Sequence, residues 1–227
     1  MKKGKLIVID GTDGSGKATQ SRLLFKNLQK QRIKTAILDF PVYDSLTGRL
    51  ITRYLKNEFG RLNPYLASML YAANRFQFRD KILQWLREGR VVILNRYVTA
   101  NQIHQAAHLK TKKERNKFVN WIGGLEYDIF GLPRPDLVIL INMPVDIANR
   151  LIQTKSAINR VRVAGSKGDM LESDLEHQKE ALRQAIKISQ SSKIWRKIDA
   201  VERGKLLSKE EINKKIFSIV SRFMAEK

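Results

Sequence analysis

The sequence predicts an α/β fold of the doubly wound type, in which helices cover both faces of a parallel sheet. Its apolar, β-branched runs are short and nearly continuous rather than alternating, which is typical of strands buried on both faces. Helix-like sequence separates each run from the next, as the connections of a parallel sheet require. We therefore expect one domain over residues 1–227, built as a five-stranded parallel sheet flanked by helices in three layers.

The strands are expected at the apolar runs, taken in order along the chain. A weak candidate, residues 197–201, would supply the last strand. The clear candidates are residues 5–10 (KLIVID), 35–40 (TAILDF), 90–96 (RVVILNR) and 135–142 (PDLVILIN).

Between these runs the apolar spacing changes to the helical period, as it does at Leu23, Leu24 and Leu28. Gly89 is placed to cap the second predicted helix at its carboxyl end. The predicted helices cover residues 17–31, 64–87, 171–196 and 209–226.

Two stretches do not fit this alternation of strand and helix. Residues 107–134 are polar and then carry glycine and proline, so we expect an irregular surface loop there. Residues 153–169 are polar, basic and glycine-containing. An ordinary basic surface loop is one interpretation of them; we prefer a lid at approximately residues 150–170, because of the arginines it contains.

The charge of the chain is strongly positive. It has 43 Lys and Arg against 22 Asp and Glu, a formal net charge of +21. The basic residues are spread along the chain, so they fit a solvated surface or an electropositive cleft for an anionic substrate. Nucleic acid as the main ligand is a less favoured interpretation.

Other bulk features narrow the class of protein. The chain has no cysteine, which excludes disulfides and thiolate metal sites. The first apolar run ends at Asp10 and is too short for a signal peptide or a membrane span. We therefore expect a cytoplasmic protein with no membrane partner.

Residues 11–17, GTDGSGK, have the spacing of a phosphate-binding loop between a predicted strand and a predicted helix. Glycines let backbone N–H groups turn towards a phosphate, the helix N-terminus adds partial positive charge, and Lys17 neutralises phosphate oxygens. A purely structural glycine turn is the less favoured alternative. The expected ATP-binding residues of the loop are Gly11, Thr12, Asp13, Gly14, Ser15, Gly16, Lys17, Ala18 and Thr19.

Ala18 occupies the position at which such loops usually carry a Ser or Thr that binds Mg²⁺. Its methyl group cannot bind a metal, but Mg²⁺ dehydrates reluctantly and can be held through phosphates and waters. We therefore expect Mg²⁺ as a cofactor with ATP, with protein ligands that the sequence leaves unknown.

Side chains suited to a second, phosphate-bearing substrate follow the predicted strands. Residues 40–41 and 95–97 end two strands, at the carboxyl edge where open α/β sheets bind ligands. Arg96 could hold a phosphate with its bidentate fork. Tyr71 and Arg75, four apart on one predicted helix, could stack on a base and hydrogen-bond its edge. Alone, Tyr71 fits core packing and Arg96 a structural ion pair; together they favour a nucleoside-monophosphate pocket.

Together these motifs resemble the thymidylate kinase family, nucleoside-monophosphate kinases that make dTDP from dTMP and ATP. The resemblance implies a P-loop kinase fold with a lid, ATP-dependent phosphotransferase activity in dTTP synthesis, and a homodimer. The segments that carry it run in family order over nearly the whole chain. They are GTDGSGKATQ (11–20), FPVYDSLTGRLITRYL (40–55), YAANRF (71–76), NRYVTANQIHQ (95–105), LPRPDLVILINMP (132–144) and the D-x-x-E of residues 169–172.

The resemblance implies roles in binding dTMP. Arg96 would hold the phosphate, Tyr71 would stack on thymine, Arg75 would donate to its O4 and Asn101 would contact the base edge. His104, where a tyrosine is common, would lie near the sugar 2′ position and disfavour ribose. The implied substrate-binding residues are Asp13, Phe40, Pro41, Tyr43, Leu55, Tyr71, Arg75, Arg96, Asn101, His104 and Gln105.

Phosphoryl transfer needs cations around the equatorial oxygens. The phosphate loop carries no arginine, so the resemblance implies that lid arginines supply this charge; which of them touches the transferred group stays open. Asp169 and Glu172 could close the lid, and Ala200 would lie beside the adenine. The implied catalytic residues are Lys17, Arg96, Arg150, Arg160 and Arg162.

Two further positions depart from the family pattern. Asn95 replaces an aspartate usually near the metal, and Ala100 replaces a common serine. With Ala18, they leave two alternatives to an active dTMP kinase. One is a nucleoside-monophosphate kinase of shifted or broader specificity; the other is a non-catalytic nucleotide- or nucleic-acid-binding protein on a kinase scaffold.

Overall fold

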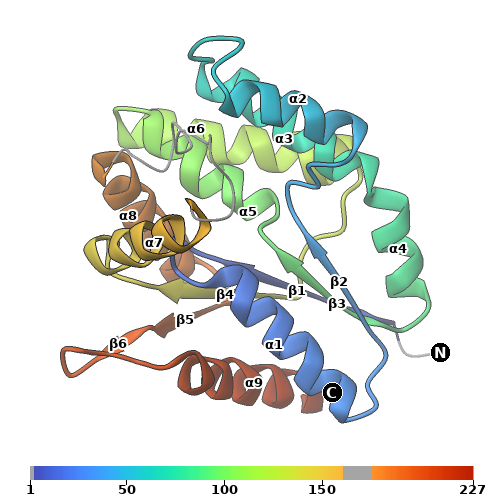
Figure 1. The fold of residues 1–227 in the computed structure, drawn as a ribbon. Helices are drawn as coiled ribbons and strands as arrows, with labels where there is room; N and C mark the ends of the chain where they lie inside the picture. Colours follow the sequence, from blue (N-terminus) through green and yellow to red (C-terminus); the bar gives the residue numbers. More distant parts are fainter. Residues whose placement is uncertain (1–2, 161–174, 227) are drawn as a thin grey trace.

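The fold is a parallel sheet between two layers of helices (Figure 1). The computed structural model describes residues 3–160 and 175–226, and within residues 155–160 the backbone alone. The five strands lie in the order β2-β3-β1-β4-β5 and all pair in parallel, which confirms the predicted fold class. They are β1 (Lys5–Asp10), β2 (Thr35–Asp39), β3 (Val91–Asn95), β4 (Leu137–Asn142) and β5 (Trp195–Asp199).

The strands bury alternate side chains on opposite faces of the sheet. Leu6 and Val8 belong to one core cluster, whereas Ile7 and Ile9 belong to the other. Each of these four side chains is fully buried, which stabilises the fold by about 1.5–3 kcal/mol apiece. Burial on both faces explains why the strand sequences are nearly continuous apolar runs.

Helices cover both faces of the sheet. The cluster around Ile7 is completed by Leu24 of α1 (Lys17–Lys30) and Ile216 of α9 (Lys209–Ala225). The cluster around Leu6 is completed by Leu86 of α4 (Arg79–Arg87) and Ala181 of α8 (Leu175–Ser191).

Three further helices form a cap beyond the end of β3. There α2 (Leu46–Leu55) packs on α3 (Pro64–Gln77), and both α3 and α6 (Lys112–Gly123) contact the π-helical turn η1 (Asn101–Gln105) (Figure 1). The other elements are α5 (Val98–Ala100), η2 (Ala106–His108), η3 (Gly124–Ile129), α7 (Val145–Arg160), β6 (Val201–Glu202) and β7 (Lys205–Leu206).

Some predicted boundaries were wrong. The expected helix over residues 64–87 is two helices, because the chain leaves helical geometry at Phe78, whose φ and ψ are −106° and 5°. The expected loop over residues 107–134 contains α6 and η3, and α6 begins with a capping box between Thr111 and Glu114. Gly89, with a φ of 74°, follows the end of α4 as predicted.

Within residues 3–160 and 175–226, no helix is long and apolar enough to span a lipid bilayer.

Candidate active site

The loop between β1 and α1 curls around the N-terminus of α1. Gly11, Gly14 and Gly16 have φ values of 148°, 76° and 88°, in the region that favours glycine. A Cβ on Gly14 would lie 2.4 Å from the carbonyl oxygen of Ala148 on α7. The sequence GTDGSGK therefore lets this loop pass close to a neighbouring backbone and lead directly into the N-terminus of α1.

Polar groups of this loop are arranged for an anion. Lys17 is buried, donates from Nζ to the carbonyl oxygen of Thr12 at 2.6 Å, and lies 3.8 Å from the carboxylate of Asp13. The hydroxyl oxygens of Thr12 and Ser15 are buried and have no hydrogen-bond partner among the described residues. A buried hydroxyl without a partner costs about 1–3 kcal/mol, which bound phosphate oxygens would offset.

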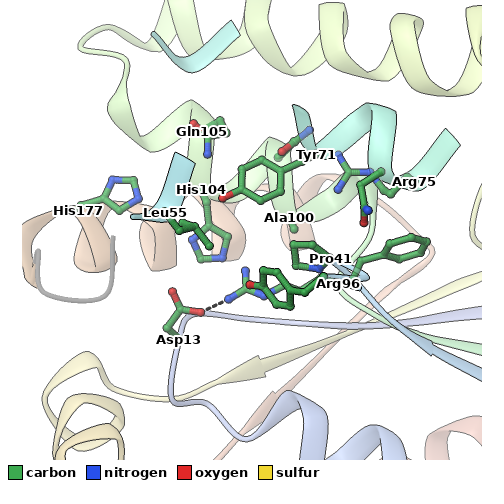
Figure 2. Close-up of a pocket in the computed structure, with 14 residues that line it drawn as sticks. Asp13, Pro41, Leu55, Tyr71, Arg75, Arg96, Ala100, His104, Gln105 and His177 are labelled. Carbon is green, nitrogen blue, oxygen red and sulfur yellow. Dashed lines mark hydrogen bonds and ion pairs between the residues drawn. The ribbon is translucent and has the colours of Figure 1, made fainter. Parts of the chain in front are cut away.

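All the predicted substrate-binding residues line one pocket beside this loop (Figure 2). They come from the phosphate loop, the end of β2, α2, α3, the turn after β3, and η1. The cavity between these side chains has a volume of about 110 Å³. In Figure 2, Tyr71 and Arg75 lie on one side of it, and Asp13 and Arg96 on the other.

Arg96 joins the pocket to the phosphate loop. Its guanidinium donates to the carboxylate of Asp13, and its backbone N–H donates to the carbonyl oxygen of Ile9 at 3.1 Å (Figure 2). Its φ of 61° lies in the left-handed region, which costs a residue with a side chain about 1–2 kcal/mol. Such strain is common where a side chain is held for function.

Arg75 is held by a carboxylate that the sequence did not single out. Its Nε and Nη2 donate to the two oxygens of Glu126, at 2.5 and 2.7 Å, and both side chains are buried. Asn101 donates to the same carboxylate at 3.1 Å. Glu126 thus connects α3, η1 and η3 behind the pocket.

His104 is neutral in this environment. Its pKa is held well below the usual 6.5 by burial and, next, by the positive charges of Arg96, Lys17 and His177. Its Nε2 is buried without a hydrogen-bond partner in the part of the chain that the structure describes. His177, at the start of α8, also lines the pocket and stacks on His108, with ring centroids 3.8 Å apart.

Three further residues line the pocket that were not predicted as substrate-binding: Asn74, Ala100 and His177. Asn74 lies between Tyr71 and Arg75 in sequence and fastens the turn after β2. It accepts from the backbone N–H of Val42 at 2.9 Å and donates to the hydroxyls of Ser45 and Thr47, at 2.9 and 3.0 Å. Its place three residues after Tyr71 on one helix face was the available signal.

Two other predicted residues, Ala200 and Arg150, do not line this pocket. Ala200 is fully buried, and its backbone is hydrogen-bonded to Asn142 and Leu207. Arg150 is exposed on α7. The side chains of Arg160, Arg162, Asp169 and Glu172, and with them most of the predicted lid, fall outside the described side chains.

The described residues hold no cluster of three or more His, Asp or Glu side chains that could bind a metal. Asn95 presents one unused group, because its Oδ1 is buried without a hydrogen-bond partner in the described ranges. An amide oxygen is a ligand that Mg²⁺ accepts beside substrate phosphates and water.

A model of the family described as "Thymidylate kinase" matches residues 9–212, which is most of the chain. The chain belongs to the thymidylate kinase family. The match covers both the phosphate loop and every residue that lines the pocket.

Individual thymidylate kinases agree with this assignment. The chain is 37% identical to that of Schizosaccharomyces pombe over 146 residues, 64% of each chain, so the match spans less than two thirds of that relative. It is 31% identical to the probable thymidylate kinase of Pyrococcus abyssi over 96% of each chain. The solved thymidylate kinase of Candida albicans, described as having broad substrate specificity, shares the fold with a TM-score of 0.73 at 22% identity, covering 97% of this chain and 92% of that one.

Proposed function

We propose that this chain is an ATP-dependent kinase that phosphorylates dTMP to dTDP, with all 227 residues in one kinase domain. The observation that carries the proposal is the pocket itself. It combines an aromatic ring and an arginine for a base with Arg96 for a phosphate, and it opens beside a phosphate loop.

The chain's own residues would position the two substrates for direct transfer. The loop around Lys17 would hold the ATP phosphates, and Arg96 would hold the phosphate of dTMP. An oxygen of that phosphate then attacks the γ-phosphorus of ATP, the bond to the β–γ bridging oxygen breaks, and dTDP and ADP form. Because the transition state spreads negative charge over the transferred group, nearby cations accelerate the reaction.

Further parts of the proposal are carried over from the resemblance to the thymidylate kinase family. Arg150, Arg160 and Arg162 would supply charge from a lid, and Ala200 would mark the adenine side. Mg²⁺, held largely by phosphates and water near Asp13 and Asn95, would neutralise charge on the phosphates. A cytoplasmic location is also kept as an expectation.

A homodimer is part of the proposal as well. Exposed apolar side chains on α2 and α3 support it, since such side chains often mark protein–protein contacts. These are Leu46, Leu50, Leu66, Met69 and Phe76. Light scattering in solution tests it, and a monomeric mass at micromolar concentration would argue against it.

The test of the activity is ADP release measured over dTMP, dUMP, dCMP, dGMP and UMP, each with and without Mg²⁺. The proposal expects the highest kcat/KM with dTMP and a requirement for Mg²⁺. Equal rates with all monophosphates would indicate a kinase of broad specificity. Salt-sensitive nucleic-acid binding with no phosphoryl transfer would indicate a non-catalytic binder.

A further inference from the structure

Glu126 is a buried carboxylate directly behind the part of the pocket assigned to the base. It lies on η3, is 0% exposed and does not line the pocket itself. The residues it contacts, Arg75 and Asn101, do line the pocket. Any effect of Glu126 on a bound base must therefore pass through these two side chains.

Glu126 determines which N–H groups of Arg75 remain available to a ligand in the pocket. The Nε and Nη2 groups of Arg75 are taken by the two carboxylate oxygens in a side-on fork, which holds the guanidinium plane. Nη1 makes no hydrogen bond to the described residues. An arginine has donors and no acceptor, so what Glu126 fixes is which N–H groups, those of Nη1, point away from the fork and remain for a ligand.

Glu126 and the carbonyl oxygen of Ser68 together set the orientation of the Asn101 amide. The Nδ2 of Asn101 donates to the carbonyl oxygen of Ser68 and to Glu126, both at 3.1 Å. These two bonds use both hydrogens of the amide nitrogen. The carbonyl oxygen Oδ1, which no described residue contacts by a hydrogen bond, is left as an acceptor.

We propose that Glu126 is a positioning residue that sets the hydrogen-bond polarity of the base site, a donor from Arg75 beside an acceptor from Asn101. Thymine and uracil present the complement, an O4 acceptor next to an N3–H donor. Cytosine presents the reverse, an N4 amino donor next to an N3 acceptor. This inference rests on the proposed function and extends it to how the site rejects cytosine nucleotides.

Hydrogen-bond complementarity discriminates between bases more strongly than shape complementarity does. A cytosine in this site would place its amino group against Arg75 and its N3 against the Asn101 oxygen, leaving buried donors and acceptors unpaired. Without the carboxylate, the Asn101 amide keeps only its bond to the carbonyl oxygen of Ser68, and the Arg75 guanidinium loses both of its acceptors. The donor and the acceptor of the site would then be less firmly positioned even though both side chains remain.

The test compares kcat/KM for dTMP, dUMP and dCMP in the wild type and in Glu126→Gln. Glu126→Gln keeps the shape of the side chain but adds an N–H₂ group facing the Arg75 donors. We expect kcat/KM for dTMP and dUMP to fall together by about tenfold or more, and the preference for dTMP over dCMP to fall at least as much. The KM for ATP should stay within about twofold, since the phosphate loop is not contacted.

Glu180→Gln is the matched control, because Glu180 accepts from Arg115 and Arg183 outside the pocket. Glu180→Gln should leave the kcat/KM values for dTMP, dUMP and dCMP unchanged. Thermal melting shows whether each variant folds. If Glu126→Gln does not fold, Glu126→Asp replaces it; this variant keeps the charge but is one methylene too short to reach both partners, and a smaller loss of the same preference is expected.

The outcomes are distinct. A folded Glu126 variant with the wild-type preference for dTMP over dCMP overturns the inference while leaving the kinase activity in place. A fall in the dTMP-to-dUMP ratio with no change against dCMP also overturns it, since these two bases share one edge. A wild-type protein that does not phosphorylate dTMP overturns both this inference and the proposed function.

Discussion

At the scale of single residues, the site is controlled by groups whose neighbours fix their charge or direction. His104 is the clearest case of charge, because burial and three nearby basic groups, Arg96, Lys17 and His177, lower its pKa. A neutral imidazole next to the phosphate loop can approach a sugar without adding a cation. Arg96, held by Asp13 and by a left-handed backbone, is the clearest case of direction.

The His104 pKa makes the stability of the fold depend on pH. A histidine whose pKa is lower in the folded state takes up its proton first in the unfolded chain, so stability is lost as the pH falls below about 6.5. His104→Gln removes this contribution. The fall in Tm between pH 7.5 and pH 5.5 should therefore be larger for the wild type than for the variant. Equal falls would show that His104 is not the group responsible.

Sequence reasoning found the residues that would touch the substrate but not the residues that hold them. Arg96 and Tyr71 follow from motif position and helix spacing, and both line the pocket. Glu126 lies 51 residues from Arg75 and meets it only after the chain has folded. Its signal is long-range pairing, which a single sequence does not display.

At the scale of elements, the phosphate loop depends on how closely β1, α1 and α7 approach. Gly14 packs against the backbone of Ala148, whereas no described atom outside the neighbouring residues lies within 4 Å of a Cβ built on Gly16. Both glycines have positive φ values, 76° and 88°. Comparing substitutions at Gly14 and Gly16 therefore distinguishes the effect of steric contact with α7 from the effect of a positive φ.

Gly14→Ala should lower Tm more than Gly16→Ala in the absence of nucleotide. Both substitutions carry the left-handed penalty of about 1–2 kcal/mol, but only Gly14→Ala must also push α7 away. Differential scanning calorimetry on the two variants gives the comparison. A larger loss in Gly16→Ala would mean that the contact with α7 is not a constraint on the loop.

Element boundaries were predictable where local sequence decides them. The five strands of the sheet were found from apolar runs, and α1 from the helical spacing of Leu23, Leu24 and Leu28. The stretch 107–134 was not, because glycine usually interrupts helices, whereas Gly123 and Gly124 adopt helical φ values of −63° and −62° here. The Thr111–Glu114 capping box was a local signal for α6 that glycine content obscured.

At the scale of the whole molecule, the net charge of +21 should act on association rather than on folding. Both ATP and dTMP are anions, so a positive field raises their concentration near the cleft. We expect kcat/KM for both substrates to fall as NaCl rises from 50 to 500 mM, because salt screens the field. A matched series at constant Mg²⁺ measures this, and kcat/KM values independent of salt would assign the charge no role in substrate capture.

The central claim is that the pocket holds dTMP while the adjoining loop holds ATP. The most direct test is the KM for each substrate in Arg96→Ala, with the other substrate saturating and folding checked by melting. Loss of a bidentate phosphate contact should raise the KM for dTMP by about tenfold or more and leave the KM for ATP within about twofold. An equal rise in both KM values would contradict the assignment of the pocket to the acceptor.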